Sequence, residues 1–290
     1  MSSALQPTHD AADPLGALRS QAGDFIALRR DIHQHPELGY QEFRTSELVA
    51  EQLGRWGYTV ARGLGGTGVV GQLVRGAGAK RLGLRADMDA LPIAEATGLP
   101  HASRHAGVMH ACGHDGHTAM LLAAARHIAA NVEFSGTLNL IFQPAEESLG
   151  GAKKMMDDGL FRQFPCDAVF GMHNMPGYPQ GHLVLRDGAM MASAETVTIT
   201  LEGRGGHGAV PHRAADPVVA GAAIVMALQS IVARNVDPQQ MAVITVGAFN
   251  AGTTDNVIPQ SATLKLSVRA LDREVRDLLE QRITELVHAQ

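Results

Sequence analysis

Residues 109–117 (MHACGHDGH) constrain what this 290-residue chain can fold into more than any other segment. The segment holds three histidines, one cysteine and one aspartate. Thiolate, imidazole and carboxylate groups together are ligands for first-row divalent metal ions. The alanine- and leucine-rich residues 118–130 follow directly and predict a buried helix that starts just past these side chains. A histidine-rich loop without a metal is the plainer alternative, and further polar clusters along the chain weigh against it.

The composition is that of an ordinary globular protein, with 45% hydrophobic residues and a formal net charge of -5. A mildly acidic chain is not expected to bind nucleic acid. Two cysteines, Cys112 and Cys166, are too few for a disulfide framework. No apolar run approaches the ~20 residues that a membrane helix needs. Residues 1–16 lack the apolar core of a secretory signal, so the expectation is a cytoplasmic enzyme.

Short apolar runs alternate with helical patterns through the first two thirds of the chain. The predicted strands are 67–74, 81–86, 137–142 and 167–171. The predicted helices are 18–30, ending before an interruption at 31–38, and then 43–56, 118–130 and 152–157. Repeated alternation of strand and helix predicts an α/β fold with a mixed, largely parallel sheet flanked by helices.

Polar side chains follow three of these strands, where open α/β sheets bind ligands. They are Asp87, the pair Glu146 and Glu147, and His173; Cys112 and His114 lie at the start of the buried helix. Each cluster alone has an ordinary alternative, such as solvated loop aspartates or acidic residues at a helix N-terminus. Adjacent glutamates on a tight turn point different ways, so one can bind a metal while the other acts as a general base. Convergence on one sheet edge predicts a metal site.

The pattern changes after residue 186, and we place a domain boundary near Asp187. The expected domains are therefore 1–186, which holds the metal ligands, and 187–290. Strands are predicted at 196–201, 242–249 and 262–269, with helices at 217–232 and 273–287. This β-α-β-β-α order is that of a ferredoxin-like α+β layer without its last strand. His207, on a glycine-rich turn, is either a surface histidine or an oxyanion donor that reaches over a site.

Taken together, the motifs resemble those of the M20 family of metallopeptidases and amidohydrolases, in the branch of hippurate hydrolase, N-acyl-L-amino-acid amidohydrolases and auxin-conjugate hydrolases. They occur in family order and span nearly the whole chain. The matching segments are 30–37 (RDIHQHPE), 85–92 (RADMDALP), 109–117, 143–147 (QPAEE), 171–174 (GMHN), 205–208 (GGHG) with 211–212 (PH), and 255–259 (DNVIP).

The resemblance implies a catalytic domain that binds two divalent metal ions, whether Mn, Zn, Co or Ni. Cys112 looks like the bridging thiolate, and His114, Glu147 and His173 look like further ligands. Glu146 looks like the general base that activates water. Asp87 lies in the segment that typically supports a ligand.

The resemblance also implies that the second domain is a lid that often mediates dimerisation, so a homodimer or homotetramer is expected. His207 is similar to the lid histidine that polarises the scissile carbonyl, often across the dimer. Asn256 and Arg269 match lid positions that hold the substrate's carboxylate, a task that suits the fork of an arginine.

The implied activity is hydrolysis of the amide bond of N-acyl-L-amino acids, either hippurate-like or N-acetylated. An alternative is a deacetylase of N-acetyl-diaminopimelate or N-acetyl-ornithine, with the same catalytic residues and a different pocket. Family members usually continue well beyond the position of Gln290 and carry a last histidine ligand there. A third possibility is therefore a truncated, catalytically inert metal-binding or dimerisation module.

Overall fold

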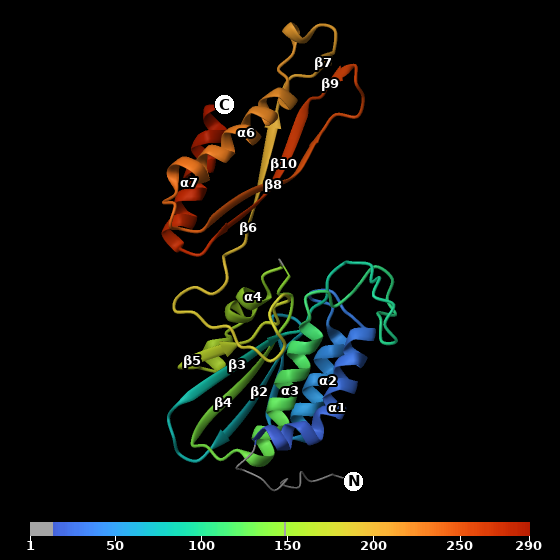
Figure 1. Ribbon diagram of the computed structural model, residues 1–290, viewed down its shortest axis with the longest axis vertical. Coiled ribbons are helices and arrows are strands. Elements are labelled where there is room, and N and C mark those ends of the chain that lie inside the picture. Colours follow the sequence, from blue (N-terminus) through green and yellow to red (C-terminus); the bar gives the residue numbers. More distant parts are fainter. Residues whose placement is uncertain (1–13, 148) are drawn as a thin grey trace. The chain divides into compact units, whose positions relative to one another are not determined.

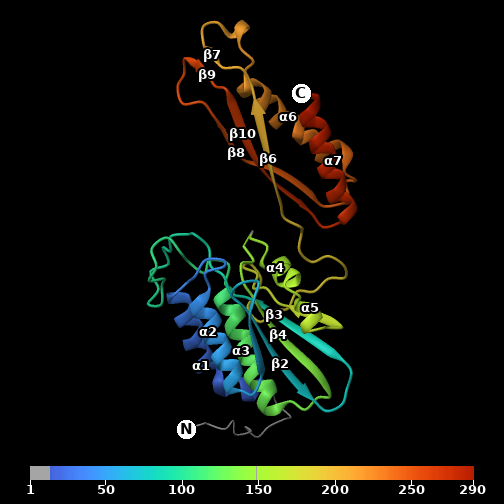
Figure 2. The same ribbon diagram turned by 180° about the vertical axis from the view of Figure 1, so that it is seen from behind.

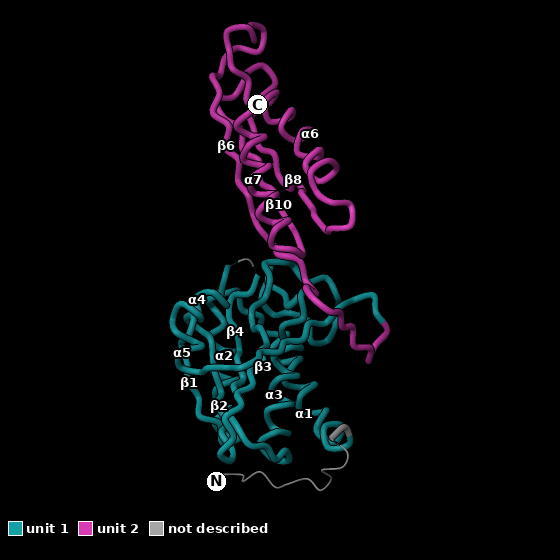
Figure 3. Tube along the Cα trace, turned by 90° about the vertical axis from the view of Figure 1, so that its left-hand side faces the viewer, with its two compact units in different colours: residues 1–178 teal, residues 179–290 magenta. Residues whose placement is uncertain are grey.

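The computed structural model describes residues 14–147 and 149–290, which form two compact units that divide between residues 178 and 179 and are called unit 1 and unit 2 (Figures 1 and 3). Asp187, the predicted domain boundary, lies in the stretch 172–194, which holds no helix or strand. Residues 1–13, most of the N-terminal segment for which no secretory signal is predicted, lie outside the described residues.

Unit 1 is built around a five-stranded sheet with the order β1-β2-β4-β3-β5. Its strands are β1 (Thr59–Leu64), β2 (Gly68–Arg75), β3 (Arg81–Asp87), β4 (Gly136–Gln143) and β5 (Ala168–Gly171). β4, β3 and β5 run parallel to one another, while β1 and β2 add an antiparallel edge. The predicted mixed sheet is confirmed. β1 was not predicted, because it is mostly exposed or half-buried and lacks a continuous apolar run.

Helices cover both faces of this sheet, as the alternation of strand and helix predicts (Figures 1 and 2). One face packs against α2 (Phe43–Arg55) and α3 (His114–Asn131), with α1 (Pro14–Gln34) beside α3. Successive side chains of a strand point to opposite faces. Leu140 and Phe142 of β4 accordingly enter the core under these helices, whereas Ile141 packs with the residues of α4 (Gly151–Asp157) and α5 (Leu160–Gln163).

The predicted interruption at residues 31–38 begins too early, because α1 runs through His33 to Gln34. Ile32 is fully buried and His33 nearly so, and their packing keeps this turn helical. The helix ends just before Pro36, as expected from the restricted backbone of the residue that precedes a proline.

Unit 2 has an antiparallel three-stranded sheet, order β6-β10-β8, with two helices packed on it. The elements are β6 (Glu195–Glu202), α6 (Pro217–Asn235), β8 (Ala242–Ala251), β10 (Ser261–Ala270) and α7 (Arg273–Ala289). They follow the predicted β-α-β-β-α order. A small pair, β7 (Gly206–His207) with β9 (Val257–Ile258), and the 3-10 turn η1 (Pro211–Arg213) were not predicted, because each is too short to show a periodic pattern.

Among the described residues, α6 alone is long and apolar enough to cross a membrane by length and composition. No apolar run of this length was predicted from the sequence. Ile224, Leu228 and Ile231 of α6 are buried in the core of unit 2. A core helix that packs on a sheet meets the same test of length and composition, so one such helix is weak evidence for a membrane span.

Candidate metal centre

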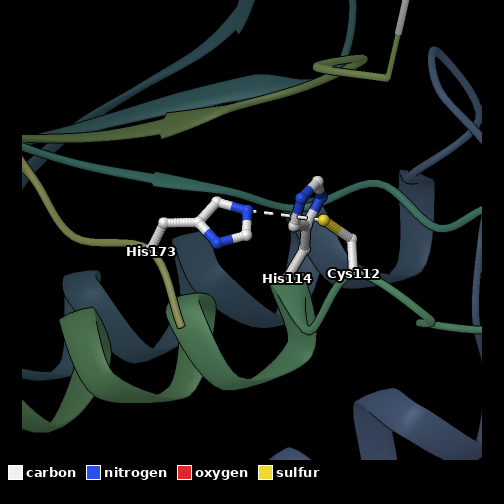
Figure 4. Close-up of side chains that lie close together, drawn as sticks. All are labelled: Cys112, His114 and His173. Carbon is white, nitrogen blue, oxygen red and sulfur yellow. Dashed lines mark hydrogen bonds between the residues drawn. The ribbon is translucent and has the colours of Figure 1, made fainter. Parts of the chain in front are cut away.

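The carboxyl ends of β3, β4 and β5 deliver side chains to one edge of the unit 1 sheet. Asp87 is the last residue of β3, Glu146 and Glu147 follow β4, and His173 follows β5. Because these strands are parallel neighbours, their carboxyl ends meet at the same edge. α3 begins at His114 beside them, so the structure brings together residues from four separate segments. Figure 4 shows three of these residues, Cys112, His114 and His173.

The side chains converge on the ring of His114, which is fully buried. Its Nε2 atom lies 3.7 Å from Asp87 Oδ2, 3.9 Å from Glu147 Oε1 and 4.0 Å from Glu146 Oε2. Cys112 Sγ lies 3.4 Å from His173 Nε2. Cys112, His114 and His173 form one group whose possible ligand atoms lie within 4.8 Å of one another, and His114, Glu146 and Glu147 form another.

This arrangement fits a metal ion. Within the described part of the chain, His114 Nε2 is a buried polar atom without a hydrogen-bond partner. A buried ring nitrogen left unpaired is costly, whereas the same lone pair is a metal ligand. The surrounding sulfur, imidazole and carboxylate donors suit Zn, Mn, Co or Ni without choosing among them. The predicted metal site is therefore supported by geometry as well as by residue type.

Asp89, for which no role was predicted from the sequence, contacts two of the candidate ligands. Its Oδ1 atom lies 3.2 Å from His114 Nδ1, and its Oδ2 atom accepts a hydrogen bond from the Glu147 backbone N–H at 2.9 Å. Carboxylates that bond the far nitrogen of a metal-binding histidine fix its ring and tautomer. The sequence signal for this role was the two-residue spacing of Asp87 and Asp89. Residues two apart in an extended segment point to the same side.

A separate role for His117 in the metal centre was likewise not predicted from the sequence. Its Nδ1 atom lies 2.6 Å from Asp87 Oδ1, and its Nε2 atom accepts the Asn174 backbone N–H at 3.1 Å. Asp87 is also held by the guanidinium of Arg85, which donates to Oδ2 at 2.8 Å. His117 lies three residues after His114 on α3, and this spacing places both rings on one helix face. Asp87 thus contacts a histidine and an arginine, and its role in supporting a metal ligand stays a prediction.

Electrostatics distinguish the side chains of this centre. Burial, with the nearby Glu147 carboxylate, raises the pKa of the Cys112 thiol to about 12, so the thiolate forms only with a cation beside it. Burial and the negative charge of Asp87 raise the pKa of Glu146, which brings this carboxylate closer to the range of a useful general base. Burial acts to raise the pKa of Asp87, but His117, Arg85 and His114 outweigh it and lower this pKa to about 2.

The backbone at Gly113 lets Cys112 and His114 approach the end of β5. Gly113 has φ +92°, in the left-handed region that favours glycine. A Cβ atom there would lie 2.5 Å from Asn174 Oδ1, well inside contact distance. The turn therefore favours glycine, and a larger residue would also have to displace the Asn174 side chain.

Three predicted site residues lie in unit 2. Gly208 N donates to Asn256 O at 2.8 Å, and His207 pairs with Val257, so His207 and Asn256 share the β7–β9 corner. Arg269 lies at the other end of β10, eight residues beyond Ser261. At about 3.3 Å per residue this is roughly 25 Å along the strand. Within one unit, Arg269 and Asn256 therefore cannot hold the same small carboxylate.

Comparison with known proteins identifies the family. The model of the peptidase family M20/M25/M40 matches residues 83–265, more than half of the chain. The chain belongs to this family. Hippurate hydrolase of Campylobacter jejuni is 55% identical over 261 residues, which cover 90% of this chain and 68% of the relative. The resemblance seen in the sequence motifs is confirmed.

Two further proteins are similar to this chain. An N-acetyldiaminopimelate deacetylase of Geobacillus thermodenitrificans is 44% identical over 266 residues, 91% of this chain and 70% of the relative. A crystal structure of a dinuclear metal-binding peptidase of the M20 family from Bacillus subtilis superposes with a TM-score of 0.76 at 34% identity, and it covers 93% of this chain and 70% of that one. The chain thus spans about two thirds of the length of these proteins.

Proposed function

We propose that the protein is a metal-dependent amidohydrolase that cleaves the amide bond of N-acyl-L-amino acids to a carboxylic acid and an amino acid. The observation that carries this proposal is the convergence of thiol, imidazole and carboxylate groups on the unpaired Nε2 atom of His114. The 55% identity to a hippurate hydrolase supports an N-acyl amino acid as the substrate class.

Cys112, His114, Glu147 and His173 would hold two divalent cations, which supply Lewis acidity to the scissile carbonyl and to water when bound. Glu146, whose carboxyl has a raised pKa, takes the proton from the attacking water and delivers it to the leaving nitrogen. Asp87 keeps its charge and, with Asp89, holds the imidazoles in place. A relative that is a dinuclear metal-binding peptidase supports the number of cations, and their identity is left to experiment.

In this proposal the substrate-binding residues of the lid come from more than one copy of the chain. His207 would polarise the scissile carbonyl, and Asn256 and Arg269 would hold the substrate's carboxylate. Because Arg269 and the His207–Asn256 corner lie at opposite ends of β10, we propose that two protomers of a homodimer or homotetramer contribute them to one site. Mixing a His207→Ala chain with a Glu146→Gln chain should then restore activity that neither variant has alone. Absence of restored activity in a mixed oligomer would exclude this arrangement.

The decisive experiment is a substrate panel on metal-free protein reloaded separately with Mn²⁺, Zn²⁺, Co²⁺ or Ni²⁺. Hippurate, N-acetyl-methionine and N-acetyl-diaminopimelate are compared by release of the free amino acid, with Glu146→Gln as the inactive control. We expect hippurate or N-acetyl-methionine to give the higher kcat/KM. Binding of metal without hydrolysis of any acyl amino acid would contradict the proposal and favour an inert metal-binding or dimerisation module.

The identity to an N-acetyldiaminopimelate deacetylase favours a second candidate of the same chemistry, a deacetylase of amino-acid biosynthetic intermediates of the diaminopimelate or ornithine type. Preference for N-acetyl-diaminopimelate in the panel would select it. A cytoplasmic location, without nucleic-acid or membrane partners, stays a prediction from the sequence.

A further inference from the structure

A fully buried carboxylate, Glu42, lies behind the turn that carries the two glutamates of the candidate metal centre. Glu42 precedes α2 and has no exposed surface. Its Oε1 atom accepts the Ala145 backbone N–H at 2.7 Å, and its Oε2 atom accepts the Thr67 hydroxyl at 2.5 Å. Burial raises the pKa of this carboxyl group. Burying an ionisable group costs free energy, so its presence here indicates a structural role.

Ala145 itself has an unusual backbone, which Glu42 holds from one side. Its φ is +49°, and among the described residues only Tyr40 is another non-glycine residue with positive φ. Alanine pays roughly 1–2 kcal/mol for a left-handed backbone, so the conformation persists only if neighbours enforce it. Tyr40 belongs to the segment that leads into Glu42, and its hydroxyl donates to Leu149 O at 2.9 Å. Both strained residues therefore lie where these two segments meet.

The approach of the two segments is close enough to require glycine. A Cβ atom on Gly39 would lie 3.1 Å from both Cα and Cβ of Ala145 and 2.6 Å from a methyl of Leu149. Backbone and side chain of Ala145 are thus fixed together by Gly39 and Glu42. Ala145 immediately precedes Glu146, so its dihedral angles set the direction in which the next peptide leaves the turn.

The other side of the turn is held by Asp89, which accepts the Glu147 backbone N–H. Glu146 consequently sits between two backbone N–H groups, one bonded to Glu42 and the other to Asp89. We propose that Glu42 is a positioning residue whose hydrogen bond to Ala145 holds the left-handed turn and so separates the directions of the Glu146 and Glu147 side chains. The role in catalysis, though not the role in metal binding, rests on the proposed hydrolase function.

Glu42→Asp tests this role, because the side chain is one methylene shorter and cannot reach both Ala145 N and Thr67 Oγ1. Glu42→Gln is the conservative partner, since its amide oxygen can still accept from Ala145 while its NH₂ donates to Thr67. Tyr58→Phe is the control for stability alone. It removes a buried hydrogen bond from Tyr58 to Ala125 O in the core of the same unit.

For Glu42→Asp we expect kcat to fall about tenfold or more, in the range seen when a group that supports metal ligands is lost. KM should stay within about twofold, because the interaction acts on the transition state and not on substrate binding. Co²⁺ affinity, read from its visible absorption, should fall as Glu147 loses its place. Glu42→Gln and Tyr58→Phe should keep kcat and Co²⁺ affinity within about threefold of the wild type.

Two readouts need no substrate and therefore separate this inference from the proposed function. Hydrogen exchange of the Ala145 amide in metal-free protein should speed up in Glu42→Asp relative to global opening. Unchanged exchange and Co²⁺ affinity in a folded Glu42→Asp protein would overturn the proposal, as would an equal fall in kcat for Tyr58→Phe. If the wild type hydrolyses no acyl amino acid, the proposed function fails, while exchange and Co²⁺ binding still decide the role of Glu42.

Discussion

Replacing Gly113 by alanine should destabilise unit 1 through two separable effects. The first is the backbone, because φ is +92° and a left-handed alanine costs roughly 1–2 kcal/mol. The second is crowding, because the new Cβ would lie 2.5 Å from Asn174 Oδ1 and 3.0 Å from its Cγ. The Asn174 side chain is exposed and can turn away, so this crowding costs about what its contact with His117 contributes, roughly 0.5–1.5 kcal/mol. The sum predicts a loss of about 1.5–3.5 kcal/mol in the free energy of unfolding.

Gly107→Ala is the matched control, because Gly107 also has positive φ, at +78°, but a Cβ there meets nothing within 4 Å. It should lose only the backbone share. The difference between the two variants, about 0.5–1.5 kcal/mol, then measures the contact with Asn174 alone. Urea unfolding followed by fluorescence gives both values for unit 1, since the single tryptophan, Trp56, lies there and packs edge-on against Phe25.

The displaced Asn174 should also disturb its bond to His117 and its neighbour His173, so metal affinity should fall in Gly113→Ala and not in Gly107→Ala. Equal unfolding free energies for the two variants, with equal metal affinities, would refute the reasoning that Gly113 is required by the packing of Asn174.

Three further predictions concern single side chains. Glu146→Gln should lower kcat at least about 100-fold while inductively coupled plasma analysis shows unchanged metal content; near-normal turnover would remove Glu146 from the role of base. Cys112→Ser should weaken metal binding in chelator competition while the free energy of unfolding of the metal-free protein changes by less than about 0.5 kcal/mol; full metal retention would count against a ligand thiolate. Because burial raises the folded pKa of Glu42 above its ordinary 4.5, the folded state holds this proton more tightly than the unfolded state. The stability of the wild type relative to Glu42→Gln should therefore fall as pH rises above 4.5, by at most about 1.4 kcal/mol per pH unit; urea titrations that show a rising or flat difference would contradict the buried site.

The sequence by itself determined the elements and the side chains at their ends. The apolar runs predicted β2, β3, β4 and β5, although only β4 is buried along nearly its whole length and β5 is an exposed edge strand. The sequence also showed which polar residues follow these strands. Parallel strands bring such residues to one edge of the sheet whatever the details of packing. The short β7 and β9 and the polar β1 escaped prediction, because their pairing depends on partner strands and not on a pattern of their own.

Only the tertiary structure decided which groups hold the candidate ligands in place. The hydrogen bond between Glu42 and Ala145 joins residues 103 positions apart, and no local sequence pattern at either residue predicts it. The sequence contains Asp89 and His117 but does not show their partners. These follow from the register of β3 beside β4 and from the position of α3. A hydrogen bond forms over about 3 Å, a distance that the packing of whole elements sets and that a sequence pattern does not contain.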